Sequence, residues 1–548
     1  MSKSALQIAR AAYKPKMPEA ITGSVKLIEG EATESVANQE EIKQLFPNTY
    51  GMPLVKFASS DVAINYVPMN VGVILSGGQA PGGHNVIAGI FDGIKAKNKA
   101  SRLFGFILGP AGLIEHNYME LTSDIINEYR NTGGFDIIGS GRTKLETTEQ
   151  FDKGLVILKA LDIKALVIIG GDDSNTNACV LAEYYAAINS GVQVIGCPKT
   201  IDGDLKNEMI ETSFGFDTAC KVYSEVIGNI QRDCNSAQKY WHFIKLMGRS
   251  ASHIALECAL QVQPNFCIIS EEVEANNMTL DAVVAEIAKV VAKRAEMGKN
   301  FGTVLIPEGL IEFIPAMKVL IGELNEFLAS HQEEFNLIRR SEQRNYIIKM
   351  LSKENSDIYA SLPDSVARQL TLDRDPHGNV QVSLIETEKL LAEMVGVKLA
   401  AWKNEGKYVG SFNTQVHFFG YEGRCAAPTN YDADYCYSLG FTASELIAFG
   451  KTGYMSSVRN TTAPASQWIA GGVPITMMMN MERRHGEMKP VIQKALVELD
   501  GAPFLKFAAK RAAWAMHSDY VYPGPIQFFG PTEVCDQPTK TLILESGK

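Results

Sequence analysis

The stretch VGVIL (71–75) followed by SGGQAPGGHN (76–85) decides the fold, because an apolar, β-branched run ends directly in a glycine-rich loop. The next residues, NVIAGIFDGIKA (85–96), carry apolar side chains at helical spacing. A short continuous apolar run is typical of a strand that is buried on both faces of a parallel sheet. The sequence therefore predicts a strand, a close-fitting loop and a helix, in this order.

Similar apolar runs before chemistry-bearing loops recur along the chain. They are ALVIIG (165–170), VQVIG (192–196), YWHFIKL (240–246) and GTVLI (302–306). Short apolar strands that alternate with helices of about 10–15 residues indicate βαβ units and parallel sheets. Because the strands exceed what one such sheet usually holds, we predict an α/β fold of two stacked, doubly wound parallel-sheet lobes.

The division between the lobes is predicted near residue 235, in RDCNSAQK (232–239). Residues 1–65 show no sustained period, and we interpret them as an N-terminal extension draped over the main body. Residues 66–235 then form the N-terminal lobe and residues 236–548 the C-terminal lobe.

Two stretches of the second lobe, 316–408 and 441–520, look mainly helical and charged. The turn DRDPHGN (373–379) interrupts the first of them. We predict that both stretches are helical insertions, whose roles the sequence leaves open.

The composition is that of a folded protein: of 548 residues, 46% are hydrophobic and 21% are charged, with a net charge of −10. An acidic balance argues against nucleic acid or an anionic membrane as the partner. The nine cysteines contain no CxxC pair, which argues against a zinc ribbon and suits a reducing compartment. With no apolar run of membrane-spanning length and no signal-like N-terminus, we expect a soluble, cytoplasmic protein.

Glycine-rich loops at strand ends favour a phosphate ligand, because helix N-termini there present unpaired N–H groups and a positive dipole. The loop SGGQAPGGHN lacks the lysine of a P-loop, and no well-placed GxGxxG or kinase signature occurs. The sequence therefore indicates a phosphate site of another design, with a tight packing turn as the alternative.

Two adjacent carboxylates, Asp172 and Asp173, occupy the loop GGDDSNTNA (170–178). One of them could cap the following helix. Two acidic side chains beside a phosphate repel it and each other, however, unless they share a cation. Mg²⁺ is commonly held by one or two carboxylates plus phosphate oxygens, so we predict a magnesium site here.

The next loop, PKTIDGDL (198–205), combines a lysine, a threonine and two carboxylates. Phosphoryl transfer needs a base for the acceptor hydroxyl and positive charge near the phosphoryl oxygens. Asp202 and Lys199 could supply these two functions. The alternative is a surface turn with solvated charges.

Further loops add what a sugar phosphate requires, namely guanidinium groups for phosphate and carboxylates for hydroxyls. These loops are GSGRTK (139–144), MGR (247–249), PEG (307–309) and YEGR (421–424).

The ordered set GGQAPGGHN, GSGRTK, GGDDSNTNA, PKTIDGD, MGR, PEG and YEGR resembles the phosphofructokinase family, from about residue 68 to 435. GGDD and PKTIDGD look like the pyrophosphate-dependent branch, because the ATP users carry glycine at the positions of Asp173 and Lys199. The length resembles the long form of that branch. In physical terms, the Asp173 carboxylate would repel an ATP α-phosphate. Lys199 would supply a positive charge for a donor that has no nucleotide to anchor it.

The resemblance implies Mg²⁺-dependent, reversible phosphoryl transfer from pyrophosphate to the 1-hydroxyl of fructose 6-phosphate. It implies Asp202 as general base, Lys199 and Asp173 as donor-selecting catalytic groups, and Asp172 as the metal ligand. The donor phosphates are then expected at Gly77, Gly78, Arg142 and Lys144. Sugar phosphate is expected at Thr200, Ile201, Asp202, Asp204, Lys239, Tyr240, Met247, Gly248, Arg249, Glu308, Tyr421 and Arg424.

In related enzymes a neighbouring subunit completes the sugar-phosphate pocket, and Lys239–Tyr240 match that position, so a homodimer or larger homo-oligomer is expected. Two alternatives remain at this point. One is an ATP-dependent 6-phosphofructokinase, against which Asp173 and Lys199 argue. The other is a catalytically silent, sugar-phosphate-binding regulatory subunit, which would have no use for the base Asp202.

Overall fold

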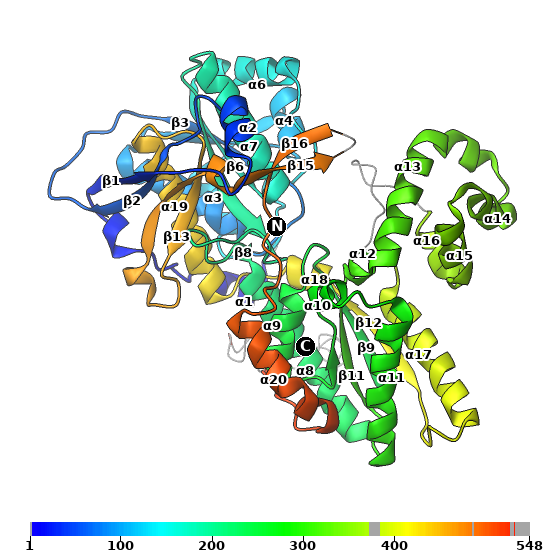
Figure 1. Cartoon of the computed structure of the whole chain (residues 1–548). Helices are drawn as coiled ribbons and strands as arrows, with labels where there is room; N and C mark the ends of the chain where they lie inside the picture. The colour runs from blue at the N-terminus through cyan, green and yellow to red at the C-terminus, as the bar shows by residue number, and fades with distance from the viewer. Residues whose placement is uncertain (1–2, 372–383, 485–486, 526–530, 532–548) are drawn as a thin grey trace, which may run out of the picture. The chain divides into compact units, whose positions relative to one another are not determined.

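The computed structural model describes residues 3–371, 384–484, 487–525 and 531 (Figure 1). Its chain packing defines two compact units. Unit 1 comprises Met1–Ala219, Glu422–Ala495 and Pro525–Lys548, and unit 2 comprises Cys220–Tyr421 and Leu496–Gly524. The chain leaves unit 1 near the start of α8 (Phe216–Ala237), whereas we expected the division near residue 235. The domain limits of the sequence analysis therefore stay a prediction.

Unit 1 is built on one large sheet, in which a parallel centre is flanked by antiparallel edges. In spatial order its strands are β1 (Val25–Ala32), β2 (Pro53–Ser59), β14 (Ile469–Pro474), β13 (Tyr454–Arg459), β7 (Gln193–Thr200), β6 (Ile163–Gly170), β3 (Asn70–Leu75), β4 (Arg102–Phe106) and β5 (Tyr118–Glu120), with β8 (Phe214–Gly215) paired to the end of β7. The run of β13, β7, β6, β3 and β4 is parallel. Five of the six residues of β3 are buried, as expected for a central parallel strand.

Helices accompany these strands in unit 1. They are α1 (Ala5–Ala11), α2 (Gln39–Leu45), α3 (Gly83–Lys97), α4 (Pro110–Ile114), α5 (Ser123–Tyr129), α6 (Thr148–Ala160), α7 (Asp172–Ala187) and α19 (Asn430–Ala448), together with α18 (Tyr421–Arg424), where the chain re-enters the unit. The start of α6 follows from its sequence, because Thr147 and Gln150 form a reciprocal capping box.

α3 and α19 pack at backbone contact. A β-carbon on Gly89 would lie 2.2 Å from the carbonyl oxygen of Tyr437, and one on Gly440 would lie 2.0 Å from that of Val86. Only glycine fits at such positions. The helix that follows YEGR is thereby fixed against the helix that follows the glycine-rich loop.

Two expectations for this part of the chain were wrong. The described residues of 454–492 form mainly strands, namely β13, β14 and the hairpin of β15 (Met479–Arg484) and β16 (Glu487–Ile492), with only two short 3-10 helices, η3 (Ala465–Gln467) and η4 (Ile475–Met478). Residues 1–65 are not merely draped over the body, because β1 and β2 extend the sheet next to β14, as the blue and orange strands in Figure 1 show. β2 and β14 pair antiparallel although they lie far apart in the sequence, and β13 joins β7 across a similarly long separation, so no local strand–loop–helix pattern predicts these strands.

Unit 2 contains a smaller, all-parallel sheet in the order β10 (Phe266–Cys267), β11 (Gly302–Pro307), β9 (Trp241–Leu246) and β12 (Thr414–Phe419). β9 and β11 are buried throughout. The mixed α/β class with parallel sheets is thus confirmed. The helices of unit 2 are α8 from Cys220 onward, α9 (His253–Val262), α10 (Ser270–Ala275), α11 (Leu280–Glu296), α12 (Leu310–Phe313), α13 (Pro315–Leu337), α14 (Arg340–Met350), α15 (Lys353–Ser361), α16 (Asp364–Gln369), α17 (Thr387–Asn404) and α20 (Ala502–Met516).

Helices α13–α17 occupy the described part of 316–408, and Figure 1 draws α14–α16 as a group at the far end of α13. The turn expected at 373–379 lies outside the described residues. Within the part of the chain that is described, no helix combines the length and apolar character that a membrane span requires.

Candidate active site

The glycine-rich loop after β3 is held by the loop that contains Arg142. Ser76 forms a parallel bridge with Gly141, and the N–H of Gly77 donates to the carbonyl oxygen of Gly141 at 2.9 Å. Gly77 has φ +81°, a conformation that favours glycine. The first two motifs of the sequence therefore lie side by side.

Cations approach this loop closely. A β-carbon added to Gly77 would lie 3.5 Å from Nζ of Lys199, and one added to Gly78 would lie 2.9 Å from Nη2 of Arg424. Because Gly77 and Gly78 have no side chains, Lys199 and Arg424 can lie directly against the loop backbone. The structure thus brings four predicted residues together from three separate motifs.

The two adjacent carboxylates lie at the end of β6. Gly171 is the N-cap of α7, so neither Asp172 nor Asp173 is the capping residue that we considered. Both lie in the first turn of α7, where the helix dipole stabilises a carboxylate by roughly 0.3–1 kcal/mol. The Ser174 hydroxyl donates to Oγ of Ser76 at 2.8 Å and ties this turn to the glycine-rich loop.

The end of β7 carries the third loop. Lys199 is buried, with 6% of its surface exposed, and Asp202 is half-buried. The N–H of Asp202 donates to Oγ1 of Thr200 at 3.0 Å, and the Ser213 hydroxyl donates to the Thr200 carbonyl at 3.1 Å. These bonds give the loop a fixed local turn rather than the flexible surface turn that we weighed against it.

Electrostatics link these loops into one site. The pKa of Lys199 is lowered to about 8: burial is the largest cause, the charges of Arg424 and Arg142 act in the same direction, and those of Asp202 and Asp172 oppose it. Burial also raises the pKa of Asp204 to about 7, with the charges of Asp202 and Asp172 acting in the same direction. A site in which buried carboxylates and buried cations perturb one another is typical of a functional centre.

Lys494 was missed by the sequence analysis. Its Nζ lies 3.5 Å from Oδ2 of Asp172, and it counteracts the rise in the pKa of Asp204. The residue follows the hairpin β15–β16, in a stretch that carried no motif. No sequence signal predicts that Lys494 lies beside Asp172, because the chain returns to α7 only through the fold of the hairpin.

The donor-side residues Arg142 and Lys144 belong to a segment that is anchored to α7. The amide of Asn177 accepts from the N–H of Leu145 at 3.0 Å, and the side chain of Gln150 donates to the Lys144 carbonyl at 3.4 Å. Arg142 is exposed and still acts on the pKa of Lys199. A donor-binding role for Lys144 stays a prediction.

Unit 2 gathers a second set at the ends of its strands. Leu246 of β9 lies opposite both Pro307 of β11 and Phe419 of β12, so the residues after these strands meet. The N–H of Gly248 donates to Oε2 of Glu308 at 2.8 Å, and Glu308 is 4% exposed. The predicted residues that follow these three strands are Met247, Gly248, Arg249, Glu308 and Tyr421.

Close packing keeps this second set in place. A β-carbon on Gly309 would lie 1.9 Å from the carbonyl oxygen of Arg249, and Gly248 has φ +125°. The N–H of Met247 donates to the carbonyl of Phe419 at 2.9 Å. The motifs MGR and PEG are therefore coupled through their backbones.

Lys239 and Tyr240 do not join this set. They precede β9, whereas Met247 follows it, so the six-residue strand separates them by about 20 Å at some 3.3 Å per residue. A role in the pocket of a neighbouring subunit stays a prediction.

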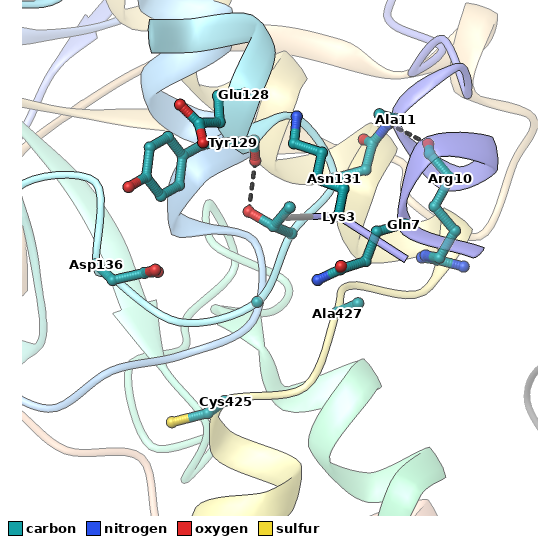
Figure 2. A pocket seen from close by; sticks show the side chains of 12 residues that line it. Lys3, Gln7, Arg10, Ala11, Glu128, Tyr129, Asn131, Asp136, Cys425 and Ala427 are labelled. Atoms are coloured by element: carbon teal, nitrogen blue, oxygen red, sulfur yellow. Dashed lines mark hydrogen bonds between the residues drawn. The ribbon is translucent and has the colours of Figure 1, made fainter. Parts of the chain in front are cut away.

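A cavity of about 290 Å³ lies elsewhere in unit 1 (Figure 2). Its lining includes Lys3 and Arg10 near the N-terminus, Glu128 and Tyr129 of α5, and Cys425. It contains none of the predicted site residues, although Cys425 directly follows Arg424. This cavity is therefore distinct from the cluster of catalytic candidates.

The described residues include no group of three or more His, Cys, Asp or Glu side chains placed to enclose a metal ion. This donor set fits Mg²⁺, which keeps several waters and takes only one or two carboxylates besides phosphate oxygens. The crowding of Asp172, Asp202 and Asp204, which contributes to the raised pKa of Asp204, is what a shared cation would relieve.

Comparison with known proteins agrees with this geometry. A sequence profile described as "Phosphofructokinase" matches residues 70–447. A protein of Porphyromonas gingivalis named pyrophosphate–fructose 6-phosphate 1-phosphotransferase is 70% identical over 545 residues, covering 100% of this chain and 99% of the relative. A protein of Entamoeba histolytica with the same name is 54% identical over 548 residues, covering 100% of both chains.

A solved structure gives the same fold at low identity. The crystal structure of a pyrophosphate-dependent phosphofructokinase from Nitrosospira multiformis superposes with a TM-score of 0.54 at 15% identity, covering 85% of this chain and 96% of that one. The similarity supports the fold assignment alone.

Proposed function

Because the chain belongs to the phosphofructokinase family, we propose that it transfers a phosphoryl group from pyrophosphate to the 1-hydroxyl of fructose 6-phosphate, reversibly and with Mg²⁺. The products are fructose 1,6-bisphosphate and phosphate, and this reaction is a step of glycolysis. The observation that carries the proposal is the burial of Lys199 beside Gly77 and Arg424, where a donor without a nucleotide needs positive charge.

The donor phosphates bind to the glycine-rich loop and its cations. Gly77 and Gly78 allow Lys199 and Arg424 to approach the loop backbone, and Arg142 and Lys144 complete the donor side. In phosphoryl transfer, negative charge spreads over the oxygens of the group in flight, so preorganised cations lower the barrier.

Asp173 selects the donor. The carboxylate lies in the first turn of α7, where the family resemblance places the α-phosphate of ATP. Two unit charges 4 Å apart repel by about 4 kcal/mol at an effective dielectric constant of 20. That repulsion would reduce ATP binding by about three orders of magnitude and leave pyrophosphate as the donor.

Asp202 takes the proton of the acceptor hydroxyl. Its backbone is fixed by Thr200, and the adjacent Lys199 stabilises the ionised carboxylate. We propose sugar-phosphate binding for the residues that the family resemblance implies, namely Thr200, Ile201, Asp204, Met247, Gly248, Arg249, Glu308, Tyr421 and Arg424. Glu308, buried and bonded to Gly248, provides an oriented carboxylate for sugar hydroxyls.

Asp172 would hold Mg²⁺ together with phosphate oxygens of the donor. Mg²⁺ bound there neutralises phosphate charge and relieves the repulsion among the carboxylates. We further propose a cytoplasmic homodimer or larger homo-oligomer, in which Lys239 and Tyr240 serve a neighbouring subunit.

The direct test is formation of fructose 1,6-bisphosphate from fructose 6-phosphate and Mg²⁺, run in parallel with pyrophosphate and with ATP. Activity with pyrophosphate alone supports the proposal. Activity with ATP alone would keep the base and overturn the donor assignment. Inactivity with both donors, in protein that binds fructose 6-phosphate by calorimetry, would indicate the regulatory-subunit alternative.

A further inference from the structure

The segment after the hairpin β15–β16 is fixed against the predicted metal ligand of unit 1. The N–H of Ile492 donates to Oγ1 of Thr176 in α7 at 3.2 Å. The N–H of Ala495 donates to the carbonyl oxygen of Asp204 at 2.7 Å. Lys494 lies between these two anchors, so its Cα position is determined by backbone hydrogen bonds to the site.

The side chain of Lys494 faces the carboxylates. Its Nζ lies 3.5 Å from Oδ2 of Asp172, and the two side chains are 31% and 22% exposed. Its charge also acts on Asp204. The ammonium group therefore interacts with acidic residues from two different loops.

The charge balance of the donor side explains why a further cation is needed there. Four carboxylates, those of Asp172, Asp173, Asp202 and Asp204, lie on two neighbouring loops. Pyrophosphate adds further negative charge and has no nucleotide through which to be anchored. Lys199, Arg142 and Arg424 form one group of cations, and Lys494 comes from a separate part of the chain.

We propose that Lys494 binds the pyrophosphate donor: it pairs with Asp172 and neutralises phosphate charge once the donor and Mg²⁺ bind. The assignment rests on the proposed function. It makes the segment that follows the hairpin β15–β16 a part of the donor site, where the sequence predicted only a helical insertion.

A purely structural role would give a different result. An ion pair that is about a third exposed contributes little to stability. Removing Lys494 should therefore leave the melting temperature almost unchanged and weaken donor binding. Lys489, on β16 opposite Glu482 of β15, offers a matched control in the hairpin that precedes Lys494.

The test compares Lys494→Met, Lys494→Arg and Lys489→Met with the wild-type protein. Pyrophosphate with Mg²⁺ is titrated by calorimetry in the absence of fructose 6-phosphate, and KM values are measured for both substrates. For Lys494→Met we expect the Kd and KM for pyrophosphate to rise about tenfold, with the KM for fructose 6-phosphate within about twofold of wild type. Lys494→Arg should recover most of the loss, and Lys489→Met should behave as wild type.

Three outcomes would overturn the assignment. These are an unchanged affinity for pyrophosphate in Lys494→Met, an equal loss in Lys489→Met, or an equal loss for both substrates. Acetylation of the wild-type protein by acetic anhydride, followed by mass spectrometry, gives an independent readout: pyrophosphate should protect Lys494 and leave Lys489 reactive. If the wild type makes no fructose 1,6-bisphosphate, the proposed function fails, and the calorimetry and acetylation still report whether Lys494 binds pyrophosphate.

Discussion

The guanidinium group of Arg424 lies against the backbone of Gly78, so closely that a β-carbon at Gly78 would be 2.9 Å from Nη2 and 3.1 Å from Cζ. The two residues are 346 positions apart, as 424 − 78 gives, and the packing of α3 against α19 brings their neighbouring segments together. The relationship places the last predicted motif of the chain beside the first.

Gly78→Ala should therefore reduce activity without unfolding the protein. The added methyl group displaces the far end of a flexible arginine, which costs little stability but moves the charge that faces the donor. We expect kcat/KM for pyrophosphate to fall about tenfold or more, with a change in unfolding free energy below about 1 kcal/mol. Steady-state kinetics and thermal unfolding test this.

Gly322→Ala provides the control for that substitution. Gly322 lies in α13 of unit 2 with nothing within 4 Å of an added β-carbon, so alanine should be neutral or slightly stabilising. Wild-type kinetics in Gly78→Ala would show that the position of Arg424 does not affect donor use.

Asp202→Asn should remove turnover and preserve binding. The amide keeps the size of the side chain but cannot accept the proton of the 1-hydroxyl. We expect kcat to fall about a hundredfold or more, within the range for loss of a general base, while the affinity for fructose 6-phosphate by calorimetry stays largely intact. Asp162→Asn, which removes a surface carboxylate paired with Lys164, should leave kcat unchanged. Near-wild-type turnover in Asp202→Asn would exclude it as the base.

Asp173→Gly should weaken the use of pyrophosphate and relieve the block on ATP. The substitution removes the carboxylate at the start of α7 and costs up to about 1 kcal/mol of helix stability, through the lower propensity of glycine and the lost interaction with the helix dipole, so Asp173→Asn is needed beside it to separate the charge from the propensity. Calorimetric titration with ATP and Mg²⁺ measures the effect. If both variants bind ATP no better than the wild type does, electrostatic repulsion is not what excludes the nucleotide.

The parallel centres of both sheets could be predicted because each strand carries its own signal. The runs at 71–75, 165–170 and 302–306 are buried strands that end in glycine-rich or acidic loops, as their residues indicate. Parallel strands place their carboxyl ends at one edge, so the order of motifs also indicated which loops meet.

The strands of unit 1 beyond β7 could not be predicted in this way. β13 extends the parallel run beside β7, and β14 pairs antiparallel with β2; both partners lie more than 250 residues away, and the residues of β13 and β14 show no strand–loop–helix order. Lys494 was missed for the same reason: its place beside Asp172 depends on a hairpin and on hydrogen bonds to α7, neither of which is encoded within its own segment.

The last prediction concerns pH. Burial, with help from Arg424, lowers the pKa of Lys199 from 10.5 to about 8. The free enzyme therefore loses this positive charge as the pH rises through about 8, and kcat/KM for pyrophosphate should fall about tenfold per pH unit above that point. Bound pyrophosphate favours the protonated lysine, so the corresponding fall in kcat should occur at higher pH.

The unfolding free energy should rise over the pH range in which kcat/KM falls. This opposite pH dependence is what distinguishes Lys199 from other titrating groups. Between pH 8 and 10.5 the unfolded chain keeps the Lys199 proton that the folded protein has lost, so the unfolded state binds more protons and the unfolding free energy rises with pH. Relative to Lys199→Met, the wild type should gain up to about 1.4 kcal/mol per pH unit in this window while losing activity. Lys199→Arg should move the alkaline fall in kcat/KM upward, because guanidinium does not titrate there. An alkaline fall at the same pH in Lys199→Arg would assign it to another group.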